Sequence, residues 1–377
     1  MFDIIKQIYL NSVFYDKKIS TNSTNELQYK PSSYLLSSIV KIRTKKFNIN
    51  NFLYDKFWIN KNLSREQLQK LNNFYWLFSL DLKSSNKSVQ TVIKNWIIKN
   101  FKYNSENWNF EITSKRIISW LSNTSLTYDS GEDQFQKDFN LIIYKQTFHL
   151  INQIEKEKKI NNKVRGAAAI ILVGLSYKNE KKFTIKGLEY LKKIISYTFD
   201  NNGFPKSRNI KLSIFFLKHL ILIREWFKES QSEIPNFIDE SIFNLGQSYA
   251  FFWENLKFDP LFNGNNNSNN QEFDTYLKRL GYSFKNNDHE FSDYVSLKDK
   301  SINLIMDVGP SPNKKFSEEY QAGALSFEFV SNGKKILTNS GYYSKKNIKF
   351  NKASKTSAAH NVLIIDDNSS CKFIKNQ

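Results

Sequence analysis

Apolar side chains recur at a spacing of three or four residues along most of the chain up to residue 256, which is the pattern of amphipathic helices. Turn-forming residues such as Asn202-Gly203 and Ile234-Pro235 separate the periodic segments. The segments are Glu66–Leu80, Val89–Asn100, Ser114–Leu121, Phe135–Glu157, Lys163–Tyr177, Thr184–Phe199, Ile210–Lys228 and Ile238–Leu256. Their lengths predict helical hairpins with short connections. Because no motif of about 33 to 45 residues recurs, an (α/α) toroid of unequal hairpins fits better than a solenoid of identical repeats.

A different pattern begins near residue 285, where short apolar runs lie between Gly-Pro, Asn-Gly and Ser-Gly pairs. The runs are Ser301–Asp307, Ala324–Val330, Lys334–Thr338 and Asn361–Asp366. An antiparallel sandwich usually needs about seven strands, so we expect one that is truncated or has an exposed edge.

The predicted fold class is therefore α followed by β: an incomplete (α/α) toroid of helical hairpins, then an antiparallel β-sandwich. Three parts are expected. Residues 1–60 would form an N-terminal extension with helices, 61–285 the toroid domain, and 286–377 an incomplete β-sandwich domain.

The composition raises the question of a charged partner. The 377 residues include 55 Lys and Arg against 36 Asp and Glu, which is a formal net charge of +19. This charge favours a polyanion: nucleic acid, an anionic membrane surface or an acidic polysaccharide. Lys, Asn, Ile and Phe are all abundant, which indicates a coding bias and weakens the charge as evidence. The lysines are spread along the whole chain and no nucleic-acid module is recognisable, so we expect no nucleic-acid partner.

Cysteine and histidine usage predicts no metal site. Cys371 is the single cysteine and cannot form an intramolecular disulfide, and the four histidines lack zinc-site spacing. Residues 1–20 mix charged with apolar side chains, unlike a secretory signal peptide. The longest apolar run, Gly166–Leu175, is about half of the ~20 residues that a membrane-spanning helix needs. We therefore expect no membrane span and a cytoplasmic location.

Eight short segments, taken in order, resemble a known family. Four come from the helical part: Asn73–Asp81, Ser114–Ser122, Lys163–Leu175 and Asp200–Asn209. Four come from the β part: Asp307–Pro312, Gln321–Phe329, Leu337–Gly341 and Ala359–Val362. Together they resemble the heparinase II/III-like polysaccharide lyases, over roughly residues 70 to 370.

The resemblance implies a toroid whose cleft, closed by a β-sandwich, holds an anionic glycan such as a glycosaminoglycan. It also implies β-elimination at a uronic acid: a base removes the proton alpha to the carboxylate, and an acid helps the glycosidic oxygen leave. The carboxylate must be neutralised by Asn, Gln, Arg or a cation, because a dianionic enolate would be too high in energy. The resemblance adds a periplasmic location as an alternative.

The family's motifs imply functional roles for particular residues. Its Asn-His pair at the start of the central helix falls on Asn161 and Asn162, so the amide is kept and the histidine is not. Its Arg is matched by Arg208, whereas its following Tyr falls on Leu212. Its His-Ala-His stretch falls on Glu319, Tyr320 and Gln321, of which Glu319 and Tyr320 could serve as acid and base. The implied catalytic residues are Asn161, Arg208, Tyr320 and His360, and the implied substrate-binding residues are Arg116, Trp120, Asn162, Arg165 and Gln321.

The metal site of the family is mostly missing from this sequence. Its Asp falls on Asn339, and only its later His is matched, by His360. A zinc ion is therefore implied by the resemblance, but Gln321, Asn339 and His360 do not make a three-ligand zinc site.

Each candidate also has a purely structural explanation. Asn161 and Asn162 could be N-caps of a helix, and Trp120, four residues after Arg116, could belong to a core. Arg208 could lie at the surface beside a helix start, and His360 could be a hydrogen-bonded structural histidine.

Three functions stay open at this point. The first is a lyase acting on a uronate-containing polysaccharide, with Arg116, Arg165 and Arg208 lining the cleft. The second is a catalytically silent protein that binds a glycan or serves surface-polysaccharide assembly, which the missing Tyr and His favour. The third and least supported is a basic nucleic-acid-binding protein.

Overall fold

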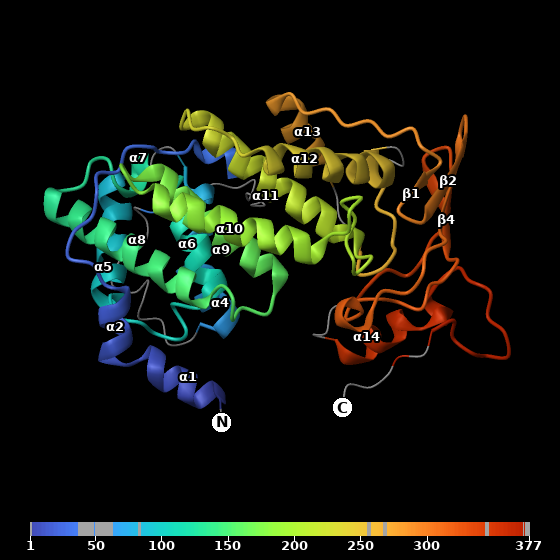
Figure 1. The fold of residues 1–377 in the computed structure, drawn as a ribbon, viewed down its shortest axis with the longest axis horizontal. Helices are drawn as coiled ribbons and strands as arrows, with labels where there is room; N and C mark the ends of the chain where they lie inside the picture. The colour runs from blue at the N-terminus through green and yellow to red at the C-terminus, as the bar shows by residue number, and fades with distance from the viewer. Residues whose placement is uncertain are drawn as a thin grey trace. The chain divides into compact units, whose positions relative to one another are not determined.

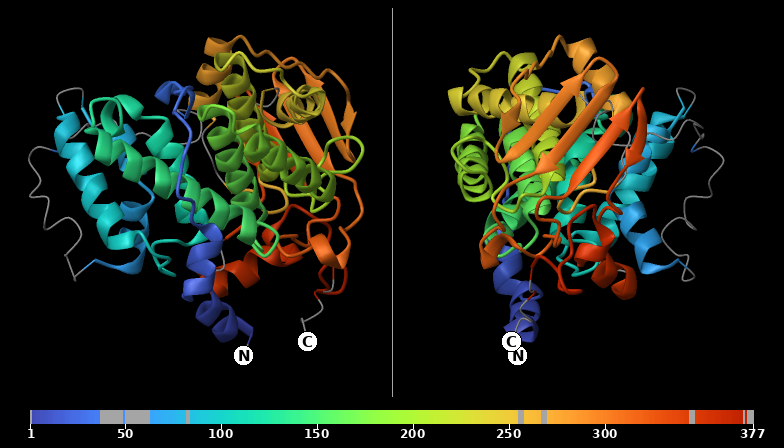
Figure 2. Two further views of the ribbon diagram at one scale, coloured as in Figure 1. Left: turned by 60° about the vertical axis from the view of Figure 1, so that its left-hand side comes forward. Right: turned by 90° about the vertical axis from the view of Figure 1, so that its right-hand side faces the viewer.

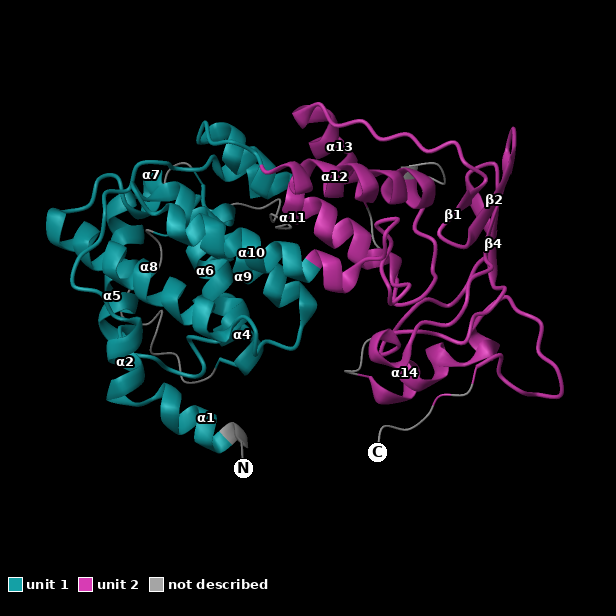
Figure 3. Cartoon of the chain, in the orientation of Figure 1, with its two compact units in different colours: residues 1–194, 221–234 teal, residues 195–220, 235–377 magenta. Residues whose placement is uncertain are grey.

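A computed structural model describes residues 2–36, 49, 63–81, 84–254, 258–266, 270–343, 347–371 and 373. The chain divides into two compact units (Figure 3). Unit 1 comprises residues 1–194 and 221–234, and unit 2 comprises residues 195–220 and 235–377. Of the predicted N-terminal extension, residues 1, 37–48 and 50–60 lie outside the described residues.

Unit 1 is built from helices (Figure 1). They are α1 (Phe2–Leu10), α2 (Val13–Ile19), η1 (Ser33–Leu36), α4 (Arg65–Asn72), η3 (Tyr75–Ser79), α5 (Asn86–Asn100), α6 (Phe110–Leu121), α7 (Thr124–Thr127), α8 (Asp133–Gln153), α9 (Ile160–Ser176), most of α10 (Lys181–Thr198) and the end of α11 (Ile210–Glu229). The predicted helical hairpins are thus present. In the described segments, no helix has an apolar stretch long enough to span a lipid bilayer.

Helix α9 forms the centre of unit 1. Residues Ala167–Val173 are completely buried. Helix α6 packs along α9, and the ring of Phe110 lies so close to Gly166 that a Cβ atom there would be 2.3 Å from a ring carbon. A helix that is apolar on all sides has to be surrounded by other helices, which explains its central position.

Aromatic residues from neighbouring helices fill the rest of this core. The rings of Trp96 on α5 and Trp120 on α6 meet edge to face, with centroids 5.5 Å apart. Phe74 contacts both rings. Phe74 has a left-handed backbone (φ 58°), which separates α4 from η3. The single helix predicted over Glu66–Leu80 is therefore wrong, and the turn at Phe74 is the reason.

Unit 2 combines the start of α11 with further helices and one β-sheet (Figure 2). The helices are α12 (Asn236–Tyr249), η4 (Ala250–Glu254), α13 (Gln271–Leu280), η5 (Lys314–Phe316), α14 (Ile348–Lys355) and η6 (Ser357–Ala359). The strands are β1 (Glu290–Phe291), β2 (Tyr294–Asp299), β3 (Ile302–Asp307), β4 (Phe327–Ser331) and β5 (Lys334–Leu337). They form an antiparallel sheet in the order β1-β2-β3-β4-β5.

The register of the sheet places polar residues on its buried face. Tyr294 pairs with Asp307, and Ile305 pairs with Glu328 on the next strand. All four side chains are buried. Buried polar groups need hydrogen-bond partners, so this face is expected to carry a polar network.

The β prediction needs two corrections. The predicted strand Asn361–Asp366 is wrong: no strand is assigned there, and Leu363 and Ile365 are exposed. A strand is stabilised by pairing with a neighbour, and none of the five strands pairs with this segment. Conversely, the sequence did not predict β1 or β2. Strand β1 has only 2 residues, and Lys298 and Asp299 interrupt the apolar pattern of β2.

Candidate functional site

The first turn of α9 in unit 1 carries three of the implied site residues. The helix begins at Ile160 with Lys159 as its N-cap, and no side chain caps it. Asn161 and Asn162 therefore lie inside the helix, and the alternative that they are N-caps is wrong. The Asn162 side-chain oxygen accepts a hydrogen bond from Arg165 Nη1 at 3.4 Å.

Two charged residues of α6 and the neutral Tyr75 of η3 lie beside this turn. Glu111 Oε1 lies 2.6 Å from Lys115 Nζ and 3.7 Å from Arg165 Nη1. Burial would raise the pKa of Glu111, but Lys115 and Arg165 lower it overall, so the carboxylate stays ionised. One carboxylate thus faces two partly exposed cations. The Lys115 ammonium also lies 5.6 Å from the ring centroid of Tyr75.

The Asn161 side-chain oxygen is a buried acceptor with no hydrogen-bond partner among the described residues. An acceptor in that state costs free energy unless a ligand or water donates to it. The start of a helix also carries a partial positive charge. Amide, guanidinium, ammonium and phenol groups at one helix start suit an anionic, hydroxyl-rich ligand.

Arg116 and Trp120 lie inside unit 1. Both are fully buried. The Arg116 guanidinium donates to the carbonyls of Asn72 and Asn107 at 2.9 Å and lies 4.0 Å from the Trp96 ring centroid. The Arg116 guanidinium thus binds groups in the core of unit 1. The structural explanation, that Arg116 and Trp120 belong to the core, fits these contacts.

Arg208 lies just before α11 in unit 2, in the left-handed conformation (φ 56°). Its Nη2 is 2.6 Å from Asp307 Oδ1, and its Nη1 is 3.3 Å from Asp293 Oδ2. Burial raises the pKa of Asp307, and Arg208 opposes that rise. Asn263 donates to the other Asp307 oxygen at 2.8 Å and to the Tyr294 hydroxyl at 3.0 Å. The guanidinium is thus a buried anchor between the start of α11 and the sheet.

Gln321 and His360 meet at one backbone carbonyl in the same unit. Gln321 Nε2 donates to the Ser354 oxygen at 2.6 Å, and His360 Nε2 lies 3.1 Å from that oxygen. Gln321 Oε1 accepts from the Gly264 amide at 3.2 Å. Burial lowers the pKa of His360. Both side chains are therefore engaged by the protein's own backbone.

Tyr320 belongs to the same buried region of unit 2. It is 3% exposed, and its hydroxyl accepts a hydrogen bond from Ser311 at 3.4 Å. Burial raises its pKa to about 12, so the phenol is neutral at physiological pH. The neighbouring Glu319 accepts from the Asn209 amide. Within unit 2, Gln321 and His360 thus meet at the Ser354 carbonyl, and the charge of Arg208 acts on the Tyr320 hydroxyl.

The residues that match the family's metal site do not fit a zinc ion. Asn339 accepts from the Asn361 amide at 3.0 Å, and Gln321 and His360 are engaged as described. Over the described part of the chain, no group of three His, Cys, Asp or Glu side chains is arranged to hold a metal. Two neutral amides and one imidazole are a poor ligand set for zinc.

Several residues of these regions were not predicted from the sequence. Three of them lie far along the chain from Asn161 and Asn162: Tyr75, Glu111 and Lys115. Two more come from a loop and from strand β3: Asn263 and Asp307. The spacing of Glu111 and Lys115 on one helix was a usable signal, because residues four apart on a helix face one another. The others are brought together only by the fold.

Helical hairpins followed by an antiparallel sheet make up the class of fold that the sequence predicted. Residues 286–377 match the family model described as Heparinase II/III-like, C-terminal. Among curated proteins, none matches this chain.

Solved structures share the fold of this chain. A crystal structure of heparinase III is 16% identical, with a TM-score of 0.61, and the match covers 98% of this chain and 69% of that one. A mutant of the heparan sulfate lyase HepC from Pedobacter heparinus is 13% identical, with a TM-score of 0.63, covering 83% of this chain and 56% of that one. A heparinase III gene product with methylated lysines is 13% identical, with a TM-score of 0.61, covering 89% and 61%.

These likenesses show the fold, and this chain spans between 56% and 69% of the lengths of those proteins. The match to the family model is confined to residues 286–377. The resemblance inferred from the sequence is confirmed. The predicted fold class, an incomplete (α/α) toroid of helical hairpins followed by an antiparallel β-sandwich, is confirmed as well.

Proposed function

We propose that this protein binds a uronate-containing polysaccharide at the start of α9 and cleaves it by β-elimination. The observation that carries the proposal is the partly exposed cluster of Arg165, Lys115 and Asn161, in which two cations face one carboxylate and a buried amide oxygen has no partner among the described residues. The names of the similar structures, heparinase III and heparan sulfate lyase, point to the same substrate class.

The chemistry of the cluster matches the first demand of the reaction. When a base takes the proton alpha to the uronate carboxylate, negative charge moves onto the carboxylate oxygens. Arg165 and the Asn161 amide would stabilise that charge. The electrons then form the carbon-carbon double bond, the glycosidic C–O bond breaks, and the leaving oxygen takes a proton.

Tyr75 is our candidate for a proton-transfer group in unit 1. Burial raises its pKa to about 12, the charge of Arg165 opposes that rise, and Glu111 adds to it. The phenol is therefore protonated at neutral pH and can donate to a leaving oxygen. A Tyr75→Phe variant should keep binding and lose turnover.

The test is to mix the purified protein with a panel of uronate-containing polysaccharides and to follow the ultraviolet absorbance of the unsaturated product. Arg165→Gln should weaken binding about tenfold or more, because it removes the cation that meets the carboxylate. Arg65→Gln is the matched control, since Arg65 is an exposed arginine at the start of α4. Equal affinity of both variants for the polysaccharide would contradict the proposed site.

A second function, binding without cleavage, is favoured by a separate observation. Tyr320 and His360 are the implied proton-transfer residues; Tyr320 is buried, His360 is partly buried, and both contact other protein groups. A protein in which these groups are occupied could hold a glycan for assembly of a surface polysaccharide. Binding of the acidic polysaccharide with no unsaturated product from any member of the panel would establish this second function and remove the first.

A further inference from the structure

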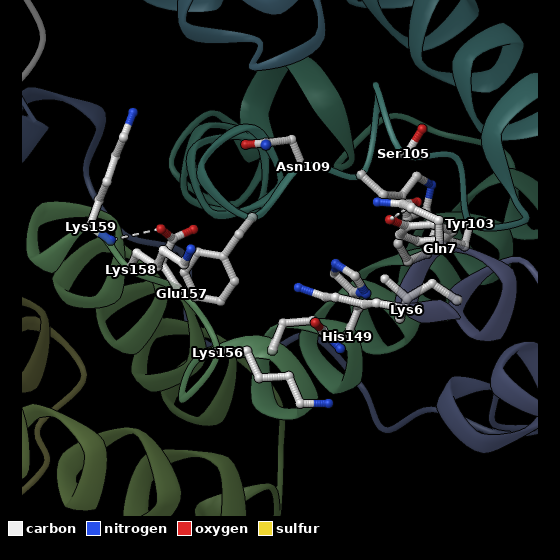
Figure 4. A pocket seen from close by; sticks show the side chains of 14 residues that line it. Lys6, Gln7, Tyr103, Ser105, Asn109, His149, Lys156, Glu157, Lys158 and Lys159 are labelled. Atoms are coloured by element: carbon white, nitrogen blue, oxygen red, sulfur yellow. Dashed lines mark hydrogen bonds between the residues drawn. The ribbon is translucent and has the colours of Figure 1, made fainter. Parts of the chain in front are cut away.

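A pocket of about 360 Å³ opens in unit 1 beside the start of α9 (Figure 4). Its walls come from α1, from the connection between α5 and α6, from the end of α8 and from the connection between α8 and α9. Its volume lies near the lower end of the usual range for ligand pockets, roughly 300–1,000 Å³. It is therefore suited to a small polar group such as one sugar ring.

The rim of the pocket is cationic. Lys6 approaches from α1, and Lys156, Lys158 and Lys159 approach from the α8–α9 connection (Figure 4). All four are exposed, and within the described ranges none of them forms an ion pair. Glu157 is the single acidic residue of the lining, and its Oε1 accepts from the Lys159 backbone amide at 2.8 Å. The rim attracts an anion from two sides.

The starts of two helices add to this field. Helix α6 begins at Phe110 and α9 begins at Ile160, and the N-cap residues of both, Asn109 and Lys159, line the pocket. The N-terminal end of a helix carries a partial positive charge. Both helix starts therefore favour a negatively charged group at the same place as the lysines.

The floor of the pocket is polar, aromatic and neutral. Gln153 is 6% exposed, and its side-chain oxygen is buried without a hydrogen-bond partner among the described residues. The His149 ring lies 5.3 Å from the Tyr103 ring, and His149 Nδ1 is 2.7 Å from the Tyr15 hydroxyl. A donor stabilises an unpartnered acceptor, and water or a ligand hydroxyl can supply one whereas a sulfate ion cannot. A sugar hydroxyl supplies that donor, and the half-buried Tyr103 ring can pack against a C–H face.

We propose that this pocket binds one anionic sugar residue, with its carboxylate or sulfate on the lysines, a hydroxyl on Gln153 and its ring against Tyr103. The pocket is a subsite separate from the Arg165 cluster, and the ligand class rests on the proposed function. Lys159 is two residues before Asn161 in the chain, so the pocket and the cluster lie at the same end of α9.

The experiment is calorimetric titration of the full chain with a sulfated glucuronyl-glucosamine disaccharide, and with cellobiose as the uncharged counterpart. The double variant Lys6→Ala, Lys156→Ala should weaken disaccharide binding about tenfold or more. Lys94→Ala, Lys192→Ala is the matched control, because it removes two exposed lysines of α5 and α10 that do not line the pocket. Gln153→Leu should weaken binding without changing the net charge.

The outcomes separate this inference from the proposed function. Equal loss of affinity in the pocket and control variants would overturn the pocket, as would binding of cellobiose as tight as that of the acidic disaccharide. Loss of polysaccharide binding in Arg165→Gln with no effect of the pocket variants would keep the proposed function and reject the subsite. Pocket-specific loss of disaccharide binding in a protein that yields no unsaturated product would support the subsite and reject the lyase.

Discussion

At the residue scale, the protein buries ionisable side chains in two different ways. Arg208 and Asp307 are buried together as an ion pair, so each compensates the charge of the other. His149 is buried beside Tyr15, no carboxylate of the described residues pairs with it, and burial lowers its pKa to about 3. The Trp108 backbone opposes this shift, and the nearby charges of Arg116 and Lys6 add to it. His149 is therefore neutral at physiological pH.

The lowered pKa of His149 predicts how stability depends on pH. Between about pH 6.5 and pH 3 the unfolded chain binds a proton at this histidine and the folded chain does not. The free energy of unfolding should thus fall with falling pH, by up to about 1.4 kcal/mol per pH unit from this group. Denaturant unfolding at several pH values between 7 and 4, each about one unit apart, measures the slope.

The variant His149→Gln should show a shallower slope over that range than the natural protein. His289→Gln, which replaces an exposed histidine, should leave the slope unchanged. Carboxylates that titrate in the same pH range contribute equally to the slope of each protein, so their contribution drops out of the comparison. Identical slopes for His149→Gln and the natural protein would show that His149 is not the group responsible.

At the element scale, close helix contacts depend on glycine. Gly174 on α9 faces the start of α10, where a Cβ atom would lie 2.3 Å from the Thr184 backbone nitrogen and 2.4 Å from its hydroxyl oxygen. Backbone atoms of a helix cannot move aside as a flexible side chain can. The glycine therefore sets how closely the two helices approach.

Gly174→Ala should destabilise unit 1 by about 1–3 kcal/mol, because the overlap with Thr184 outweighs the gain in helix propensity of about 1 kcal/mol. Chemical denaturation followed by circular dichroism provides the measurement. Lys192→Ala on the exposed side of α10 is the control and should change stability by no more than about 0.5 kcal/mol. A Gly174→Ala protein as stable as this control would refute the packing argument.

At the scale of the whole molecule, the net charge of +19 gives any acidic polysaccharide a long-range attraction to the protein. The positive residues are spread over the chain, and their long-range attraction to a polyanion acts across water. The Debye length falls from about 10 Å at 0.1 M salt to about 3 Å at 1 M salt, so this attraction is screened at high salt.

The affinity for a long heparan-type polysaccharide should therefore decrease steadily as sodium chloride rises from about 0.1 M to about 1 M. Part of the affinity at the Arg165 cluster should remain at high salt, because the charges of this cluster are partly buried and therefore less screened. Affinity measurements over this salt range, with dextran as the neutral control, test the prediction. An affinity for the acidic polymer that does not change with salt would contradict it.

The pattern of apolar positions predicts much of the helical architecture. Periodicity of three or four residues identified most helices between residues 86 and 254, including the segment Lys163–Tyr177 that contains α9, but it did not identify α13 or α14. Strands were harder to predict. Tyr294–Asp299 has charged residues at its end, and Asn361–Asp366 has the composition of a strand without a neighbour to pair with.

The sequence by itself determined that helices come first and strands follow, and that residues 286–377 resemble the heparinase II/III-like family. Only the tertiary structure decided that Arg116 is buried with Trp96, that Arg208 is paired with Asp307, and that Lys6 and Lys156 share a pocket. The physical reason is that local periodicity depends on neighbours in sequence. Burial and the pairing of charges depend on residues that are far apart in the chain and meet only in the folded protein.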